Sequence, residues 1–316
     1  MKIAIILDPL DAIKTYKDTT YAMMMEAAAR GHQLHVLMPD GVIWKQGRVI
    51  GESRRLELTG ETEHWYRVDP LREDALSDFD AVLMRKDPPF DMEYVTATWL
   101  LELAGREGAR VFNDPRALRD HSEKLAIAEF PQFTTPSLVS RMEKQIHQFI
   151  DEHADVVVKP LDGMGGAQIF RVTNTDPNRN VIVETLTWHG TRSIMAQRYI
   201  PEISAGDKRI LLIAGEPVPY SLARIPKAGE TRGNLAVGGT GVAQPLSARD
   251  REIAAALGPT LARRGLLLVG LDAIGDYLTE INVTSPTCFR EIHEQTGCNV
   301  AALFIDALEK ACARPG

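Results

Sequence analysis

Short apolar runs alternate with longer amphipathic segments in the first third of the chain, and this pattern narrows the possible folds more than any other feature. The runs have the length of buried strands, and the segments between them have the periodicity of helices. We predict strands at 2–7, 32–38 and 79–85 and helices at 21–31 and 93–108. Such alternation predicts an α/β fold with a parallel sheet, in which ligands approach the carboxyl ends of the strands. Asp8 and Arg85 occupy such ends.

A change of pattern near residue 121 divides the chain. Paired strands and helices follow it, with a strand before a helix at 142–153 and another at 154–160. A third region contains strands near 209–215 and 217–225 and a helix near 251–265. We therefore predict three parts, with boundaries at 1–121, 122–200 and 201–316. Residues 39–70 read as a hairpin excursion from the first part.

Composition excludes several classes of protein. The 316 residues are 44% hydrophobic and 25% charged, as in ordinary soluble proteins, and no apolar stretch approaches the length that spans a membrane. A net charge of −7 argues against general nucleic-acid binding. The three cysteines have no CxxC spacing, which favours the cytoplasm over an oxidising compartment. No GxGxxG follows the first strand and no GxxxxGK[ST] occurs, so a nicotinamide enzyme and a P-loop are not predicted.

Residues 270–287, GLDAIGDYLTEINVTSPT, read as a hairpin that aims three oxygen ligands at one point. Glu280 and Asn282 are two apart and share one face of a strand. A two-residue loop at 275–276 would set Asp272 opposite Thr279, on the wrong face, whereas a loop widened to include Tyr277 sets it opposite Glu280. We predict the wider loop and a magnesium site. The alternative is that all three are ordinary polar positions of a half-exposed hairpin.

The run VVVKPLDGMGGAQIF indicates a phosphate-binding loop between two strands. Gly163, Gly165 and Gly166 would let backbone amides approach a polyphosphate, and Lys159 would add a charge at the end of the incoming strand. A plain glycine turn explains one or two of these glycines, but not the preceding lysine. Lys124, expected early in a helix that Ser122 caps, could supply a second phosphate contact.

Two further segments give weaker signals. Backbone groups from Gln197 to Ile200 could read an adenine edge, and Asp207 could bind ribose hydroxyls, although Asp207 is equally a turn residue beside Gly206. The glycine-rich stretch 226–241 is either a disordered surface loop or a mobile lid. Arg232 within it favours a lid that protects a reactive intermediate from water.

Taken together, these residues resemble the ATP-grasp superfamily of carboxylate-amine ligases. Within it, the strings RKDPPFD (85–91), KPLDGMGG (159–166), LARIPKAGETRGNLAVGG (222–239) and TEINVTSPT (279–287) look like the bacterial glutathione synthetase family nearly end to end. The resemblance implies a parallel-sheet substrate domain followed by two ATP-grasp subdomains of α+β type. Thr240 and Ser193 are positions where departures from the family pattern are expected.

The resemblance also implies a reaction. ATP phosphorylates the cysteinyl carboxylate of γ-glutamylcysteine, and the amine of glycine attacks the acyl phosphate to give glutathione, ADP and phosphate. Magnesium, or manganese in its place, and a homotetramer are implied as well. The implied site residues are these: nucleotide binding by Lys124, Lys159, Gly163, Met164, Gly165, Gly166, Gln197, Tyr199, Ile200 and Asp207; substrate binding by Arg85, Arg209, Arg224, Asn282 and Ser285; catalysis by Arg209, Arg224 and Arg232; and metal binding by Asp272, Glu280 and Asn282.

Two other functions stay open at this level. A peptide-tailing or D-alanine-type ligase would keep the ATP site and differ at 85–91 and in the lid, because acceptor choice depends on contacts outside the ATP site. A regulatory module without turnover would have lost a metal ligand or a phosphate lysine, and none is lost here. Cys288 is expected to be a small buried residue rather than a nucleophile.

Overall fold

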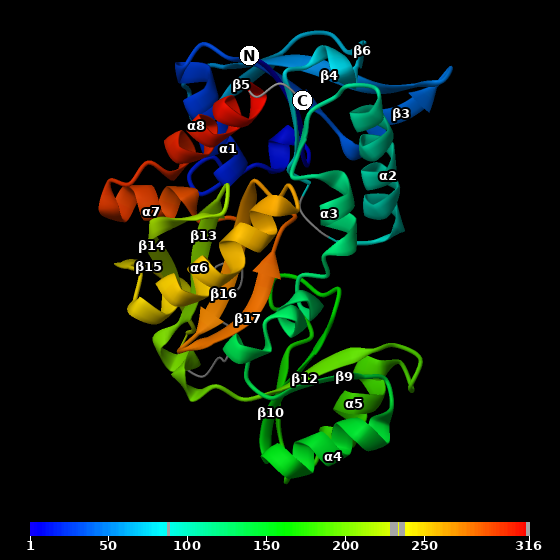
Figure 1. The fold of residues 1–316 in the computed structure, drawn as a ribbon, viewed down its shortest axis with the longest axis vertical. Helices are drawn as coiled ribbons and strands as arrows, with labels where there is room; N and C mark the ends of the chain where they lie inside the picture. The colour runs from blue at the N-terminus through cyan, green and yellow to red at the C-terminus, as the bar shows by residue number, and fades with distance from the viewer. Residues whose placement is uncertain (87–88, 228–232, 234–237, 314–316) are drawn as a thin grey trace.

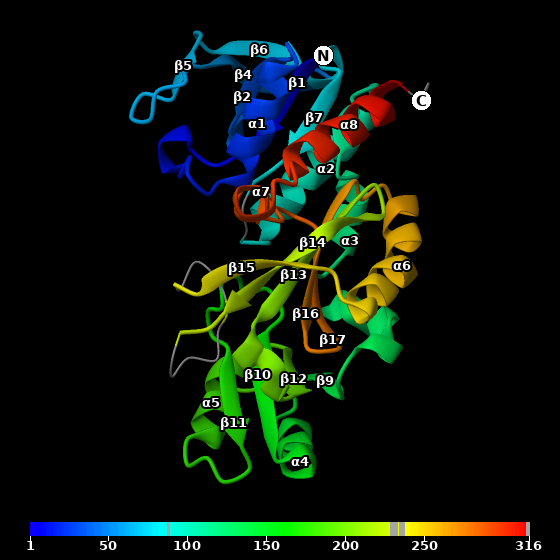
Figure 2. The ribbon, with the colours of Figure 1, turned by 90° about the vertical axis from the view of Figure 1, so that its left-hand side faces the viewer.

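Three sheets follow one another along the long axis of the molecule (Figures 1 and 2). The computed structural model describes residues 1–86, 89–227, 233 and 238–313. None of the helices within these ranges is long and apolar enough to cross a membrane. The C-terminus returns to the region of the first sheet, so both ends of the chain lie at the same end of the molecule (Figure 1).

The first sheet has the order β3-β4-β2-β1-β7-β8, with β5 and β6 paired to β4. Its centre, β2-β1-β7-β8, is parallel, which confirms the sheet predicted from the strand and helix alternation. The predicted hairpin excursion is also present, as β3 and β4. The elements are β1 (Lys2–Ile6), α1 (Thr19–Ala29), β2 (Gln33–Leu37), β3 (Val42–Lys45), β4 (Arg48–Leu58), β5 (Tyr66–Val68), β6 (Arg72–Ala75), β7 (Ala81–Met84), α2 (Met92–Arg106), β8 (Val111–Phe112) and α3 (Pro115–Asp120).

The second sheet is antiparallel, in the order β11-β10-β12-β9, and its helices α4 and α5 complete a small core of its own. Its elements are β9 (Ser137–Ser140), α4 (Glu143–His153), β10 (Asp155–Pro160), β11 (Phe170–Thr173), α5 (Arg179–Thr187) and β12 (Ile194–Arg198). The prediction of an α-helix after Ser122 is wrong. A short 3₁₀ segment, η4 (Leu125–Glu129), takes its place, with Lys124 just before it and no side-chain cap.

The third sheet is antiparallel in the order β15-β14-β13-β16-β17. Its elements are β13 (Asp207–Ile213), β14 (Glu216–Ile225), β15 (Thr240–Pro245), α6 (Ala248–Arg263), β16 (Leu268–Ile274), β17 (Tyr277–Asn282), α7 (Phe289–Thr296) and α8 (Val300–Ala313). Ser247 caps α6 in a reciprocal capping box with Asp250. Helix α8 lies against α1 of the first region, where Arg30 pairs with Asp306 at 2.6 Å (Figure 1).

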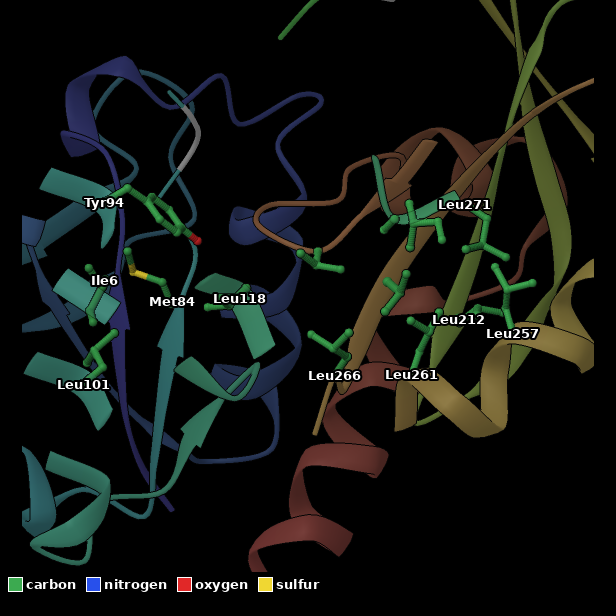
Figure 3. Packing of buried hydrophobic residues seen from close by; sticks show 14 of the residues in the cluster. Ile6, Met84, Tyr94, Leu101, Leu118, Leu212, Leu257, Leu261, Leu266 and Leu271 are labelled. Atoms are coloured by element: carbon green, nitrogen blue, oxygen red, sulfur yellow. The ribbon is translucent and has the colours of Figure 1, made fainter. Parts of the chain in front are cut away.

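The apolar core joins the first and third regions. Figure 3 shows Ile6, Met84 and Leu101 on one side and Leu212 and Leu257 on the other, all within one buried cluster. On α1, Met23 and Met24 are fully buried, whereas Met25 is exposed. A second cluster packs α7 and α8 against α1 and the first sheet. The third sheet is therefore held on the first region, and its face toward the second sheet carries the polar residues described next.

Candidate active site

A cavity of about 320 Å³ lies between the second and third sheets. Most of the site residues predicted from the sequence line it. They are Lys124, Lys159, Gly163, Met164, Gly165, Gly166, Gln197, Tyr199, Ile200, Asp207, Arg209, Arg224, Asp272, Glu280, Asn282 and Ser285. Two predicted residues are not among them. Arg232 lies outside the described residues, and so does most of the predicted lid; Arg85 lies at the end of β7, where its guanidinium donates to Thr20 Oγ1 and to the carbonyl of Pro286 at 3.0 Å.

The hairpin of β16 and β17 pairs Asp272 directly with Glu280, as predicted, but not by the predicted loop. Ile274 pairs with Tyr277, so the turn is the tight one at 275–276 and the wider loop is wrong. The register shifts instead at Thr279, where a β-bulge places one extra residue between the two pairs. The Thr279 hydroxyl donates to the carbonyl of Asp272 at 3.1 Å. The bulge therefore brings Asp272 back to the position opposite Glu280.

Charged residues form a row across three adjacent strands. Arg209 on β13 pairs with Asp272 on β16, which in turn pairs with Glu280 on β17. Residues directly opposite one another in a sheet share one face, so this row faces the cavity. Arg209 reaches Asp272 Oδ2 at 3.0 Å, and Arg224 from β14 reaches the same oxygen at 2.8 Å. The site thus places two buried guanidiniums beside one buried carboxylate.

Burial and pairing shift the pKa values of these acids in opposite directions. Burial alone would raise the pKa of Asp272, but the guanidiniums of Arg209 and Arg224 outweigh it and hold that pKa well below its usual range. Burial raises the pKa of Asp207, although Arg224 binds it at 2.6 Å and acts against the shift. Its second oxygen, Oδ1, is buried and has no hydrogen-bond partner among the described residues. An acceptor of this kind suits a ligand hydroxyl, as predicted for ribose.

Lys124 and Lys159 reach the cavity from two separate segments. Lys124 donates to the Gly163 carbonyl of the glycine loop and to Glu280 Oε1 at 2.8 Å. Lys159, 7% exposed, lies near the end of β10, and burial lowers its pKa to about 8. The loop between β10 and β11 carries Gly165 and Gly166 at φ of +61° and +81°, which a residue with a Cβ rarely adopts.

Several groups of residues 197–200, the segment predicted to bind the adenine edge, already make hydrogen bonds within the protein. The amides of Arg198 and Tyr199 donate to the carbonyls of Pro136 and Asp155, at 3.0 and 2.9 Å. The Gln197 side chain donates to Ser137 at 3.0 Å. A base edge would therefore meet the chain at Ile200, where β12 has ended.

Several residues that line the cavity were not predicted from the sequence. Five of them are apolar: Val157, Ala167, Ile169, Ile203 and Ile274. Val157 could have been found, since it lies two residues before Lys159 and so shares its face of β10. Glu123, Thr279, Thr284 and Thr287 are polar lining residues that were also missed. Only the position of Glu123 beside Lys124 could have suggested it.

The oxygen atoms at the end of β17 fit a hard divalent cation. Asn282 donates its amide nitrogen to the Gly270 carbonyl at 3.3 Å, which leaves its oxygen as the acceptor. Together with the carboxylates of Glu280 and Asp272, this makes an all-oxygen donor set of the type magnesium prefers. Within the described ranges, no group of three or more His, Cys, Asp and Glu residues could hold a metal, so such a site depends on the asparagine.

Family profiles and known proteins match nearly the whole of this chain. The profile of the prokaryotic glutathione synthetase N-terminal domain matches residues 1–119, and that of the prokaryotic glutathione synthetase ATP-grasp domain matches 123–297. A glutathione synthetase of Nitrosomonas europaea is 65% identical over 99% of both chains. One of Ralstonia nicotianae is 61% identical over 99% of this chain and 97% of the relative.

Solved structures with the same fold are more distant in sequence. The D-cycloserine synthetase DcsG superposes with a TM-score of 0.68 at 15% identity, covering 98% of this chain and 99% of that one. The ATP-grasp ligase PsnB in complex with a precursor peptide and AMPPNP gives a TM-score of 0.63 at 18% identity, with 99% of each chain covered. These likenesses concern the fold alone.

Proposed function

The chain belongs to the prokaryotic glutathione synthetase family, and from this premise we propose how its cavity carries out the reaction. It is an ATP-dependent ligase that forms glutathione. We propose that the two substrates joined are γ-glutamylcysteine and glycine. The observation that carries this proposal is the cavity itself, which combines two lysines, a glycine loop, two guanidiniums and an oxygen donor set in one space.

The chemistry has two steps. In the first, a carboxylate oxygen of the dipeptide bonds to the γ-phosphorus of ATP, the bond to the bridging oxygen breaks, and ADP leaves. In the second, the glycine amine attacks the carbonyl carbon, the phosphate leaves with the bonding electrons, and the nitrogen loses a proton. Both steps bring anions together, so charge stabilisation and positioning supply most of the catalysis.

The residues divide this work according to their places in the cavity. Lys124, Lys159 and the loop 163–166 bind the phosphates, and Asp207 accepts from a ribose hydroxyl. Arg209 and Arg224 stabilise the transferred phosphoryl group and the tetrahedral intermediate. Asp272, Glu280 and Asn282 would hold magnesium, or manganese in its place. When bound, such an ion neutralises the phosphate charge.

The N-terminal anchor and the lid stay predictions. We propose that Arg85 and Ser285 mark the side of the cavity from which the dipeptide enters, because the Ser285 hydroxyl lies 3.4 Å from the Arg85 carbonyl and Ser285 lines the cavity. Residues 226–241, with Arg232, are proposed to cover the intermediate. The division into 1–121, 122–200 and 201–316 is proposed on the same basis, one sheet to each part.

A substrate omission assay tests the proposed substrates. Purified protein is mixed with Mg-ATP, γ-glutamylcysteine and glycine, and ADP and glutathione are measured with each amino substrate left out in turn. We expect glutathione only in the complete mixture, in a ratio to ADP near one. Turnover with D-alanine pairs but not with this set would overturn the assignment.

We also propose a homotetramer in the cytoplasm. Helix α2 exposes Met92, Trp99 and Leu103, and the neighbouring strand β3 exposes Trp44. Large apolar side chains gathered in this way support an interface between copies. Light scattering after size exclusion measures the mass directly, and a monomeric mass at micromolar concentration would contradict the tetramer.

Raising the pH above 8 is expected to weaken nucleotide binding. Because burial lowers the pKa of Lys159 to about 8, the ammonium is charged at pH 7 and mostly neutral at pH 9. Only the charged form attracts phosphate, so the Kd for Mg-ADP should rise about tenfold between these pH values. Calorimetry in two buffers should show proton uptake on binding near pH 8. Lys159→Arg, charged throughout, should show neither effect, and a flat profile for the native protein would contradict the assignment.

A further inference from the structure

The segment 283–287 lies at the end of the cavity opposite Ile200, which we call the nucleotide hinge because the base edge is expected to meet the chain there. Strand β17 begins at Tyr277, whose hydroxyl is 3.4 Å from Arg198 beside the hinge, and it ends at Asn282. At about 3.3 Å per residue, the strand carries the chain roughly 17 Å away from the hinge. There Thr284, Ser285 and Thr287 line the cavity. This end also borders the N-terminal region, since Arg85 donates to the carbonyl of Pro286.

Glu123 holds the start of this segment with a single oxygen. Its Oε1 accepts from the amides of Val283 and Thr284 at 2.8 and 3.0 Å, and from the Thr284 hydroxyl at 2.9 Å. Three donors thus converge on one carboxylate oxygen and fix the backbone at Val283 and Thr284. The segment has left the sheet at this point, so Glu123 replaces the ladder bonds that a neighbouring strand would otherwise provide.

A second tether holds the other side of the same residue. Asn113, which follows β8 of the first sheet, donates from Nδ2 to the carbonyls of Val283 and Leu268, both at 2.8 Å. Val283 therefore has its amide bound by Glu123 and its carbonyl bound by Asn113. Neither tether belongs to the third sheet, so the position of residues 283–287 depends on parts of the chain more than 150 residues away in sequence.

The order of ligands along the cavity indicates what this end receives. The nucleotide base belongs near Ile200, and the phosphates belong near Lys159 and Glu280, so the atoms that react with the γ-phosphate must come from beyond Asn282. We propose that Glu123 is a positioning residue for the second half-reaction, holding residues 283–287 where the acceptor amine of glycine meets the acyl phosphate. This inference rests on the proposed function and deepens it.

Loss of the Glu123 carboxylate should affect the two half-reactions unequally. The backbone carbonyl of Glu123, which accepts from the Ile281 amide at 2.8 Å, is unchanged by substitution, so Lys124 and the phosphate end keep their support. Residues 283–287 lose their anchor, and a displacement near 1 Å can cost about a hundredfold in rate. Glycine then competes poorly with water for the acyl phosphate. Hydrolysis would release phosphate without forming glutathione.

The test compares Glu123→Ala with Glu123→Gln. In the alanine variant we expect the KM for glycine to rise at least about tenfold and the ratio of ADP to glutathione to rise from one to about three or more, with the KM for ATP changed less than about threefold. Glutamine keeps an oxygen at the same distance from the backbone and should restore coupling. A merely structural role would lower stability without changing the ADP to glutathione ratio.

Two further variants complete the experiment. Glu129→Ala changes a residue of η4, just after Glu123. It removes a carboxylate that pairs with Arg264 at 3.0 Å outside the cavity, and the two half-reactions should stay coupled. Thr284→Val removes one of the three hydrogen bonds and should shift the glycine KM and the ratio in the same direction by a smaller factor. If Glu123→Ala does not fold, Thr284→Val is used to test the proposal in its place.

Several results would overturn the inference. They are a ratio of one in both Glu123→Ala and Thr284→Val, an equal rise in the KM for ATP and for glycine, or a glutamine variant as uncoupled as the alanine variant at equal thermal stability. Failure of the proposed function looks different, because the native protein itself would then form no glutathione from the two substrates.

Discussion

Glu280→Gln is expected to lower turnover about a thousandfold while the protein stays folded. Glu280 lies on β17 at the cavity wall, and its carboxylate pairs with Lys124 at 2.8 Å. The substitution keeps the shape of the side chain but removes the charge that would hold magnesium. A metal ion stabilises transition-state charge by several kcal/mol, and each 1.4 kcal/mol corresponds to a factor of ten in rate. The collapse should therefore appear in kcat.

Initial rates and thermal unfolding together check this prediction. The matched control is Glu73→Gln, which breaks an exposed pair with Lys45 of the same 2.8 Å length on the first sheet. Exposed pairs contribute little, so this variant should keep native activity and stability. Near-normal turnover in Glu280→Gln would show that the metal site is misplaced.

Lys124→Met is expected to change metal and nucleotide affinity in opposite directions. Lys124 pairs with the carboxylate that a metal ion would need, so the lysine and the ion compete for Glu280. Hydrogen bonds to charged groups contribute about 1.5–3 kcal/mol, and their loss should raise the affinity for Mn²⁺ in the absence of nucleotide at least about tenfold. The same substitution removes a phosphate contact and should weaken Mg-ADP binding by a similar factor.

Titration with Mn²⁺, followed by electron paramagnetic resonance, measures the first effect, and calorimetry with Mg-ADP measures the second. Lys45→Met serves as the control, because that lysine is exposed and far in the fold from the cavity. If Mn²⁺ binds Lys124→Met no better than the native protein, the lysine does not compete for Glu280. The affinity of the native protein for Mn²⁺ would then be limited by some other group.

The hairpin of β16 and β17 shows which structural features a local sequence pattern can predict and which it cannot. Strand periodicity correctly predicted that Glu280 and Asn282 share one face, and the pairing of Asp272 with Glu280 was also predicted correctly. The loop was predicted wrongly, because the sequence pattern shows that one residue must be accommodated but not where. The tight turn stays at 275–276, and the extra residue is absorbed at Thr279, whose hydroxyl bonds to the Asp272 carbonyl.

The residues in and around the cavity also differ in whether a local sequence pattern could reveal them. Lys159 and the glycines could be found because they lie where a strand gives way to a loop. The tethering roles of Glu123 and Asn113 could not be predicted, because they consist of bonds to main-chain atoms of residues 283 and 284. Such contacts join segments about 160 and 170 residues apart, and no local pattern reports them.

The sequence by itself determined the order of most strands and helices, the chemical types of most residues that line the cavity, and the family. These follow from periodicity and residue identity, which are local properties. Only the tertiary structure decided which charges meet: Asp272 with Arg209 and Arg224, and Lys124 with Glu280. The physical reason is that pairing is set by sheet register and by packing between regions, which depend on contacts that form only when distant segments fold together.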